Sequence, residues 1–459
     1  MPPSPLAPPL ASAAPAPDIR AGRLPAPEYA RRFADATPPL KPAQALLEAE
    51  RCLYCYDAPC SKACPTAIDV PSFIHRIADG NLRGAANAIL EANPLGGLCA
   101  RVCPTETLCE AACVHQTHAN QPVAIGRLQR YAVDALMASD QPQLFTRAAQ
   151  SGKTVAVLGA GPAGLACAHT LARLGHRVQI YDARAKPGGL NEYGIAAYKL
   201  ADGFAQAEVQ WLLGIGGITL HCGWRLDSVS QFETLRRTHD AVFLGLGLAA
   251  TVALGIPGEQ LNGVHDAVDF IARLRQTQDL AQLPIGRRVV VIGGGMTAID
   301  ASVQSKLLGA EEVHMVYRRG AATMAASGAE QAWAQTRGVV LHEWLAPLEI
   351  LGHDGQVSGV CFAEQSIVDG RLTPTGRRVQ WDADMVLKAI GQRPGHPVLE
   401  QAGLSLQDGR VRVDAHGQTS LPGVWAGGDC RAGGPDLSVQ AVQDGKIAAH
   451  AMDAHWRSV

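Results

Sequence analysis

The feature that most constrains this chain is a concentration of cysteines in its N-terminal part. Eight of the twelve cysteines lie between Cys52 and Cys113. Soft thiolate side chains at such short separations can share a metal centre without closing long, entropically costly loops. Clustered cysteines without an export signal are more typical of metal ligands than of disulfides. Between the two halves of this segment, the alanine-rich stretch 72–93 has apolar residues at helical spacing, and 125–137 also predicts a helix. We therefore expect a small α-helical domain with a partly inorganic core.

The eight cysteines fall into two groups, written here with their spacing: Cys52-x2-Cys55-x4-Cys60-x3-Cys64-Pro65, and Cys99-x3-Cys103-Pro104 followed by Cys109-x3-Cys113. A proline follows one cysteine in each group, as a proline follows the last cysteine of bacterial ferredoxin runs. Structural zinc takes similar thiolate sets and is the alternative. By spacing alone, we expect two all-cysteine iron–sulfur clusters that include Cys99.

A dinucleotide-binding fingerprint comes soon after the last clustered cysteine. The apolar stretch 153–158 predicts a strand, and it leads into Gly159, Gly161 and Gly164 and then a helix. These glycines allow a tight turn, a close approach of the backbone to a pyrophosphate, and close packing of helix on strand. The free N–H groups of the helix N-terminus favour an anion. Asp182, which ends the next predicted strand, is positioned to bind a ribose hydroxyl.

A second, weaker fingerprint lies after the predicted strand 288–292. Gly293, Gly295 and Ala298 fit it, because alanine is allowed at the third position. No acid ends the following strand, and Arg318 and Arg319 stand there instead. Arginines at this place can bind a 2′-phosphate, which favours NADP over NAD. A solvated basic strand end is the alternative, so NADH and NADPH both remain open.

The order of these motifs predicts an α/β fold with an N-terminal α-helical iron–sulfur domain and two Rossmann-like domains. The stretch 423–429 and the predicted helix 439–453 resemble a return to the first Rossmann-like domain, so the second is expected to be inserted in the first. The expected divisions are a flexible Pro/Ala-rich arm at 1–39, the helical domain at 40–150, the FAD-binding domain at 151–285 and 391–459, and the NAD(P)H-binding domain at 286–390.

Composition excludes several kinds of partner. The formal net charge of the 459 residues is −2, so no broad basic field would attract nucleic acid or an anionic membrane. No apolar run is long enough to span a bilayer. The N-terminal stretch lacks the basic start and apolar core of a signal peptide. We therefore expect a cytoplasmic protein without nucleic-acid or membrane partners.

Several short motifs occur around the clustered cysteines. They are Asp57-Ala-Pro-Cys60, Ala63-Cys-Pro-Thr66, Ile68-Asp-Val-Pro-Ser-Phe73, Cys99-Ala-Arg-Val-Cys-Pro-Thr105 and Ile125-Gly-Arg-Leu-Gln129. These motifs resemble the N-terminal half of dihydropyrimidine dehydrogenase. The resemblance covers about residues 40–455, and it is strongest to the separate flavin subunit of the bacterial NAD-dependent enzyme. The glutamate synthase small subunit shares the same architecture.

The resemblance implies a particular set of cofactors and ligands. It implies two 4Fe–4S clusters, one of which has a glutamine ligand, and it makes Cys99 a spectator. It also implies FAD in the first Rossmann-like domain, with Gly188 and Gly189 in a turn beside the flavin and Asp429 at its ribityl chain. The implied cluster ligands are Cys52, Cys55, Cys60 and Cys113 for one cluster and Cys64, Cys103, Cys109 and Gln129 for the other.

The resemblance also implies a function. NAD(P)H would be oxidised at FAD, and electrons would pass through the clusters to an FMN-containing partner that reduces uracil or thymine, in a heterotetramer. No eight-fold strand–helix pattern is left in the chain for a pyrimidine-reducing barrel. A glutamate synthase small subunit, or a related electron-input module, is the nearest alternative. A non-catalytic zinc-binding scaffold is an alternative of another class.

Overall fold

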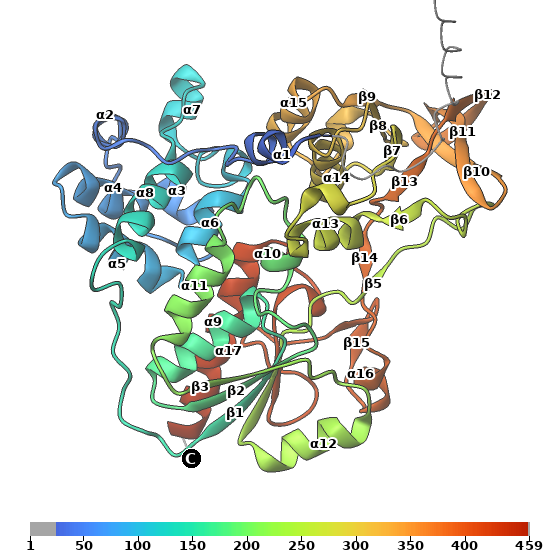
Figure 1. Cartoon of the computed structure of the whole chain (residues 1–459). Coiled ribbons are helices and arrows are strands. Elements are labelled where there is room, and N and C mark those ends of the chain that lie inside the picture. The colour runs from blue at the N-terminus through green and yellow to red at the C-terminus, as the bar shows by residue number, and fades with distance from the viewer. Residues whose placement is uncertain (1–23, 458–459) are drawn as a thin grey trace, which may run out of the picture.

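The computed structural model describes residues 24–457, and its helical N-terminal part holds all eight clustered cysteines (Figure 1). The predicted helix at 125–137 is confirmed as α8. The predicted helical stretch 72–93 is two helices, because Gly80 takes a left-handed conformation with φ +75°. The elements of this part are α2 (Pro42–Glu50), α3 (Pro59–Ala63), α4 (Val70–Ala78), α5 (Leu82–Ala92), α6 (Gly96–Val102), η1 (Thr105–Thr107), α7 (Val114–Ala119) and α8 (Ile125–Met137).

Part of the expected N-terminal arm is ordered, which corrects the prediction of a flexible segment at 1–39. Residues 26–32 form α1 (Ala26–Arg32), and the ring of Tyr29 is buried with its hydroxyl donating to the Leu308 carbonyl oxygen at 3.4 Å. Asp35 accepts from Arg130 of α8 at 2.5 Å. The apolar and charged contacts outweigh the entropy of a Pro/Ala-rich stretch there. Residues 1–23 lie outside the described part of the chain.

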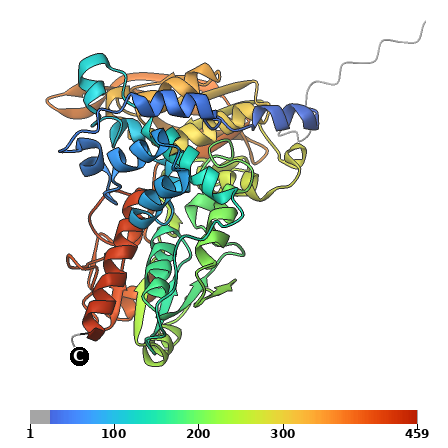
Figure 2. The same ribbon diagram turned by 90° about the vertical axis from the view of Figure 1, so that its left-hand side faces the viewer.

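The first nucleotide-type sheet has five parallel strands in the order β17-β4-β1-β2-β3. Its central strands are buried on both faces, as expected of parallel sheets covered by helices. Helices α9 and α17 pack together against it, and the upper end of α17 in Figure 2 reaches the cysteine-rich part. There, Lys446 of α17 donates to the Ala92 carbonyl oxygen. The elements are β1 (Thr154–Leu158), α9 (Pro162–Arg173), β2 (Arg177–Asp182), α10 (Leu190–Tyr193), α11 (Phe204–Leu213), β3 (Ile218–Cys222), α12 (Val229–Thr238), β4 (Ala241–Leu244), α16 (Pro397–Gln401), β15 (Leu406–Gln407), β16 (Arg410–Val411), β17 (Val424–Ala426), η4 (Gly428–Cys430) and α17 (Ser438–Arg457).

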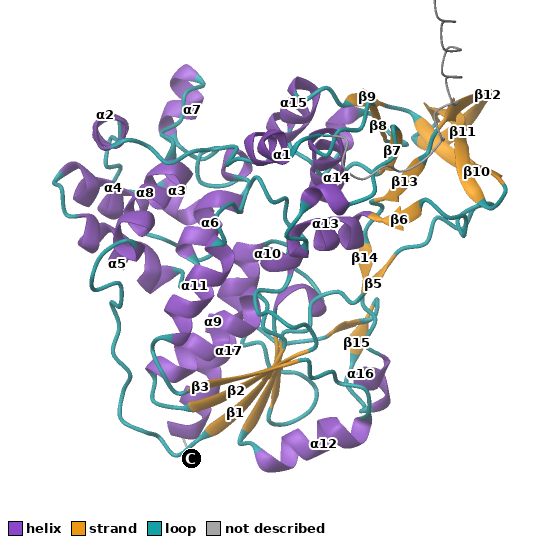
Figure 3. Cartoon of the chain, viewed as in Figure 1, coloured by secondary structure: helices purple, strands orange, loops and turns teal. Residues whose placement is uncertain are grey.

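The second sheet also has five parallel strands, in the order β6-β13-β7-β8-β9 (Figure 3). Since β17 returns to the first sheet after all of these strands, the second unit is inserted in the first, and the predicted fold class is confirmed. The short antiparallel pair β5 and β14 joins the two units. The elements are β5 (Ala250–Thr251), β6 (Val264–Asp266), α13 (Ala267–Gln276), η2 (Leu280–Gln282), β7 (Arg288–Ile292), α14 (Met296–Leu307), β8 (Glu312–Val316), η3 (Ala321–Thr323), α15 (Gly328–Thr336), β9 (Val340–His342), β13 (Met385–Lys388) and β14 (Gln392–Arg393).

Two features differ from the expected division of the chain. Strand β6 and helix α13 belong to the second unit, so this unit begins before the expected boundary at residue 286. Strand β6 is too short for its pattern to show which sheet it joins, and its pairing with β13 decides it. The second unit also carries an antiparallel three-stranded sheet of β10 (Leu345–His353), β11 (Gln356–Val368) and β12 (Arg371–Asp382). Among residues 24–457, no helix has the length and apolarity to cross a bilayer.

Candidate active site

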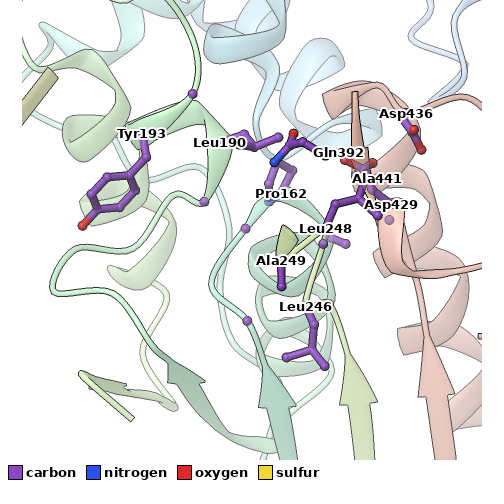
Figure 4. A pocket seen from close by; sticks show the side chains of 18 of the residues that line it. Pro162, Leu190, Tyr193, Leu246, Leu248, Ala249, Gln392, Asp429, Asp436 and Ala441 are labelled. Carbon is purple, nitrogen blue, oxygen red and sulfur yellow. The ribbon is translucent and has the colours of Figure 1, made fainter. Parts of the chain in front are cut away.

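A cavity of about 1190 Å³ opens at the carboxyl end of the first sheet, where open parallel sheets bind ligands. Its wall brings together residues from all three parts of the chain. Gly159 and Asp429 come from the first unit, Met296 from the second and Cys103 from the cysteine-rich part. Figure 4 shows part of this lining, with Pro162, Leu190, Gln392 and Asp429 among the labelled side chains.

The first glycine loop leaves bare backbone in this cavity. Gly159 has φ +103°, and a Cβ there would lie 2.2 Å from the Gly245 carbonyl oxygen. A Cβ on Gly164 would lie 1.9 Å from the Gly159 carbonyl oxygen, so helix α9 can pack this closely only with glycine. Gly161 is the N-cap of α9, and a Cβ on it would meet nothing closer than the Gly189 Cα, at 3.9 Å. The helix N-terminus therefore has room for a pyrophosphate.

The turn at Gly188 and Gly189 lies against this loop. Gly188 donates its N–H to the Ala160 carbonyl oxygen at 2.8 Å, and both glycines have positive φ angles of 123° and 57°. Asp182 stands at the end of β2, where its Oδ2 accepts from the Ala160 N–H at 2.6 Å. In this structure the carboxylate braces the loop and also lines the cavity.

Asp429 lies in η4 and also lines the cavity. Burial raises its pKa to about 6, and the neighbouring carboxylate of Asp436 acts in the same direction, while Arg410 opposes both. The N–H of the preceding residue, Gly428, donates to Asp444 of α17 at 2.9 Å. This bond fixes the turn that carries Asp429.

The second glycine loop has the same local geometry in the inserted unit. Gly293 has φ +153°, and a Cβ there would lie 2.2 Å from the Ala389 carbonyl oxygen. Gly295 is the N-cap of α14 with open space around it, and Ala298 is fully buried. Arg318 and Arg319 follow β8 with exposed side chains. Within the described chain, neither guanidinium makes a hydrogen bond or ion pair, so both are available to a ligand.

The structure groups the thiols differently from their order in the sequence, and the first thiol group (Cys52, Cys55, Cys60 and Cys113) surrounds a small apolar cavity in the helical part. Cys52, Cys55, Cys60 and Cys113 line this cavity with apolar side chains such as Ile74. Burial raises the pKa of Cys60 to about 11, and the nearby Cys52 and Cys113 add to the rise. Between residues 24 and 457, no three Cys, His, Asp or Glu side chains converge on a point suited to a single metal ion. The four thiols instead face a shared space.

The second thiol group consists of Cys64, Cys99, Cys103 and Cys109, and of these Cys103 lies on the wall of the large cavity. A hydrogen bond that the Cys103 thiol donates to the Cys99 side chain, together with burial, raises the pKa of Cys103 well above its usual range, and nearby Cys109 and Cys64 contribute. Gln129 of α8 is buried, and its Nε2 donates to the Gly96 carbonyl oxygen at 2.6 Å. The amide nitrogen is used in that bond, so the amide oxygen is the atom that an iron would take.

Sequence reasoning missed a buried carboxylate that joins the cysteine-rich part to the flavin-type unit. Glu208 of α11 is fully buried and accepts the N–H groups of Gly97 at 2.7 Å and Leu98 at 3.0 Å. Burial raises its pKa to about 8, against the effect of these two N–H donors. No local signal marks this glutamate, because its partners lie about a hundred residues earlier in the chain.

The fold and this cavity define a class of protein, the oxidoreductases that carry a flavin and a pyridine nucleotide on two Rossmann-like units. The N-caps Gly161 and Gly295 leave room for a pyrophosphate at each helix N-terminus, and thiolates are the usual ligands of iron–sulfur clusters. The comparison with protein families gives the particular family. Residues 153–445 match the family described as pyridine nucleotide-disulphide oxidoreductase, and residues 29–141 match dihydropyrimidine dehydrogenase domain II, 4Fe-4S cluster. The chain belongs to the pyridine nucleotide-disulphide oxidoreductase family.

Curated relatives confirm the resemblance seen in the sequence. The chain is 35% identical to the NAD-dependent dihydropyrimidine dehydrogenase subunit PreT of Escherichia coli O157:H7, over 91% of this chain and 96% of the relative. It is 33% identical to the glutamate synthase [NADPH] small chain of Halomonas elongata, over 93% and 94% of the two chains. The chain is therefore an NAD(P)H-dependent flavin oxidoreductase with FAD and a 4Fe–4S domain.

Solved structures support the fold alone. Mycobacterium tuberculosis FprA in complex with NADPH matches 67% of this chain and 85% of its own, with a TM-score of 0.57 and 19% identity. Thioredoxin reductase of T. acidophilum matches 66% of this chain and 99% of its own, with a TM-score of 0.51 and 21% identity. Both matches have the extent expected of the two nucleotide-binding units without the cysteine-rich part.

Proposed function

We propose that this chain is the electron-input subunit of a dihydropyrimidine dehydrogenase. It would oxidise NAD(P)H and deliver single electrons to an FMN-containing partner that reduces uracil or thymine, in a heterotetramer. The observation that carries the proposal is the cavity whose wall joins both nucleotide-binding units to Cys103. The 35% identity to a subunit with this printed name supports the substrate.

The two nucleotide sites are assigned to the two glycine loops. FAD supplies the step between hydride and single-electron chemistry when it is bound. We assign its pyrophosphate to the N-terminus of α9, and the residues that hold the cofactor are Gly159, Gly161, Gly164, Asp182, Gly188, Gly189 and Asp429. The NAD(P) site comprises Gly293, Gly295, Ala298, Arg318 and Arg319.

Two 4Fe–4S sites are assigned to the two thiol groups. Cys64, Cys103, Cys109 and Gln129 would hold the cluster next to the large cavity, and Cys52, Cys55, Cys60 and Cys113 would hold the other one. Replacing a thiolate by the glutamine oxygen removes a negative charge and changes the potential of that site. The Cys99 side chain contacts that of Cys103. Cys99 is therefore the alternative to Gln129 as the eighth cluster ligand.

The proposed exit for electrons is the cluster site of Cys52, Cys55, Cys60 and Cys113, which line the small cavity. Leu53 is 60% exposed beside its cysteines, and Tyr56 is fully exposed. Exposed apolar side chains of this size are typical of surfaces that contact another protein. They support a partner that docks over Cys52 and Cys55.

The test is an anaerobic pull-down of the chain from its native extract, assayed for NAD(P)H-dependent reduction of uracil. The isolated chain should reduce dyes but not uracil, and activity should appear with a co-purified FMN protein. Uracil reduction by the isolated chain would refute the subunit assignment. Co-purification with a glutamine-cleaving partner would favour a glutamate synthase small subunit, for which the Halomonas elongata relative is the supporting observation. A colourless purified protein that contains zinc and no iron would favour the alternative of a non-catalytic zinc-binding scaffold.

A further inference from the structure

A segment of the first unit connects the two nucleotide-binding helices. It begins at Gly189, whose Cα approaches Gly161 at the start of α9, and it ends at Lys199 on the inserted unit. We name residues 189–199 the bridging segment. Its position links the turn beside the first glycine loop to helix α14, which follows the second glycine loop.

Backbone hydrogen bonds hold this segment on α14. The N–H of Ala196 donates to Asp300 Oδ2 at 3.2 Å, and the N–H of Ala197 donates to Gln304 Oε1 at 3.1 Å. The hydroxyl of Tyr198 donates to Asp300 Oδ1 at 3.2 Å. Asp300 and Gln304 lie one turn apart on α14, so the segment lies along one face of that helix.

Lys199 adds a buried ion cluster at the end of the segment. Its Nζ lies 2.8 Å from Asp300 Oδ1 and 2.8 Å from Glu330 Oε1. Burial alone would lower the pKa of Lys199, but the two carboxylates outweigh it and hold the pKa above its usual value. The amine is therefore charged, and it is the counter-ion that lets two carboxylates stand together at a buried place.

This ion cluster lies where the three parts of the chain meet. Lys199 and Asp300 line the same cavity as Met296, the first residue of α14. Glu330 lies on α15, and Ser327 at the N-cap of α15 donates to Glu106 of the cysteine-rich part. A shift of Lys199 would therefore move α14 relative to the first glycine loop.

We propose that Lys199 is a positioning residue for hydride transfer, because it fixes α14 and the nicotinamide nucleotide bound there at a set distance from the flavin. Hydride transfer breaks the nicotinamide C4–H bond and carries two electrons and one proton to the flavin, so the nucleotide is oxidised and FAD is reduced. Such a step depends steeply on the separation of the two rings. Removing the amine takes away the cation that contacts both Asp300 and Glu330, and the repulsion between the two carboxylates opens the junction.

The inference rests on the proposed assignment of the two nucleotide sites but not on the final acceptor. The test compares Lys199→Met, which removes the charge at similar length, with Lys199→Arg, which keeps it. Lys153→Met is the matched control, because Lys153 pairs with Asp240 at 3.1 Å on the exposed surface. Flavin content and the Kd of NAD⁺ and NADP⁺ are measured first in all variants. Normal values in the unaltered chain establish the two sites separately.

The expected result is a separation of kcat from binding. In Lys199→Met, kcat for NAD(P)H-dependent dye reduction should fall at least about tenfold, toward the roughly 100-fold loss typical of a misplacement of about 1 Å, with flavin content kept and nucleotide Kd changed less than about threefold. The rate of flavin bleaching should become sensitive to deuterium at the nicotinamide C4. Lys199→Arg should recover kcat to within about threefold of the unaltered chain.

Two outcomes overturn the inference. One is a kcat for Lys199→Met that matches that of Lys153→Met. The other is a parallel loss of nucleotide affinity and rate that Lys199→Arg does not restore, because this would assign Lys199 to folding or binding. If Lys199→Met does not fold, Lys199→Gln removes the charge but keeps an N–H donor for Asp300 and should give the same separation in weaker form, and an unchanged kcat and isotope effect in that variant refute the proposal.

Discussion

The clearest physical prediction concerns the buried carboxylate of Glu208, which joins α11 to the start of α6. Its pKa is about 8 in the folded chain against an ordinary value of 4.5. Between these pH values the folded chain holds a proton that the unfolded chain has lost. The free energy of unfolding therefore falls as the pH rises through this window. Below pH 4.5 the glutamate is protonated in both states, so this destabilisation is absent there.

The magnitude follows from the size of the shift. At about 1.4 kcal/mol per pKa unit, the rise from 4.5 to about 8 corresponds to a loss on the order of 5 kcal/mol by pH 8. Glu208→Gln keeps a side-chain oxygen for the Gly97 N–H but cannot ionise. The variant should therefore match the unaltered chain near pH 5 and gain stability relative to it toward pH 8.

The assay is the midpoint of thermal unfolding, measured at several pH values for both proteins with the same flavin content. At roughly 2 °C per kcal/mol for a large domain, the difference in midpoint should grow by on the order of 10 °C between pH 5 and pH 8. Glu91→Gln is the control, because Glu91 is an exposed glutamate paired with Arg173. Parallel curves for Glu208→Gln and the unaltered chain would refute the reasoning.

Three further predictions concern the assigned cofactor sites. Gly164→Ala should abolish tight FAD binding, because a Cβ 1.9 Å from a carbonyl oxygen forces α9 away from β1; the flavin-to-protein ratio measures this. Replacing Arg318 and Arg319 together by alanine should raise KM for NADPH at least about tenfold with little change for NADH, if these side chains bind a 2′-phosphate. Cys99→Ala should keep the full iron content whereas Cys103→Ala loses iron, as iron analysis of anaerobic protein would show.

Each of these predictions has a contrary outcome. Gly328→Ala is the control for the glycine loop, because a Cβ there meets nothing within 4 Å; equal flavin loss in both variants would remove the steric argument. Equal changes in KM for NADH and NADPH would show that Arg318 and Arg319 do not bind a 2′-phosphate and are only a solvated basic strand end. Equal iron loss in the two cysteine variants would favour the all-cysteine arrangement over Gln129.

Much of the fold and part of the candidate site could be predicted from the sequence, because their signals are local. A glycine loop between a strand and a helix is contiguous, and the steric reason for Gly159 and Gly293 operates within a few residues. The cysteine groups have the same property. Gln129 came only from the resemblance, since a single glutamine in a helix carries no signal of its own.

Tertiary structure decided the features that join distant segments. The pairing of β6 with β13, the packing of α1 on the inserted unit and the burial of Glu208 each depend on residues far apart in the chain. The place of Cys103 on the wall of the large cavity and the meeting of Lys199 with Glu330 have the same cause. The sequence alone thus determined which cofactors the chain is suited to bind. Only the folded chain set how those sites face one another, because that geometry is fixed by contacts that close long loops.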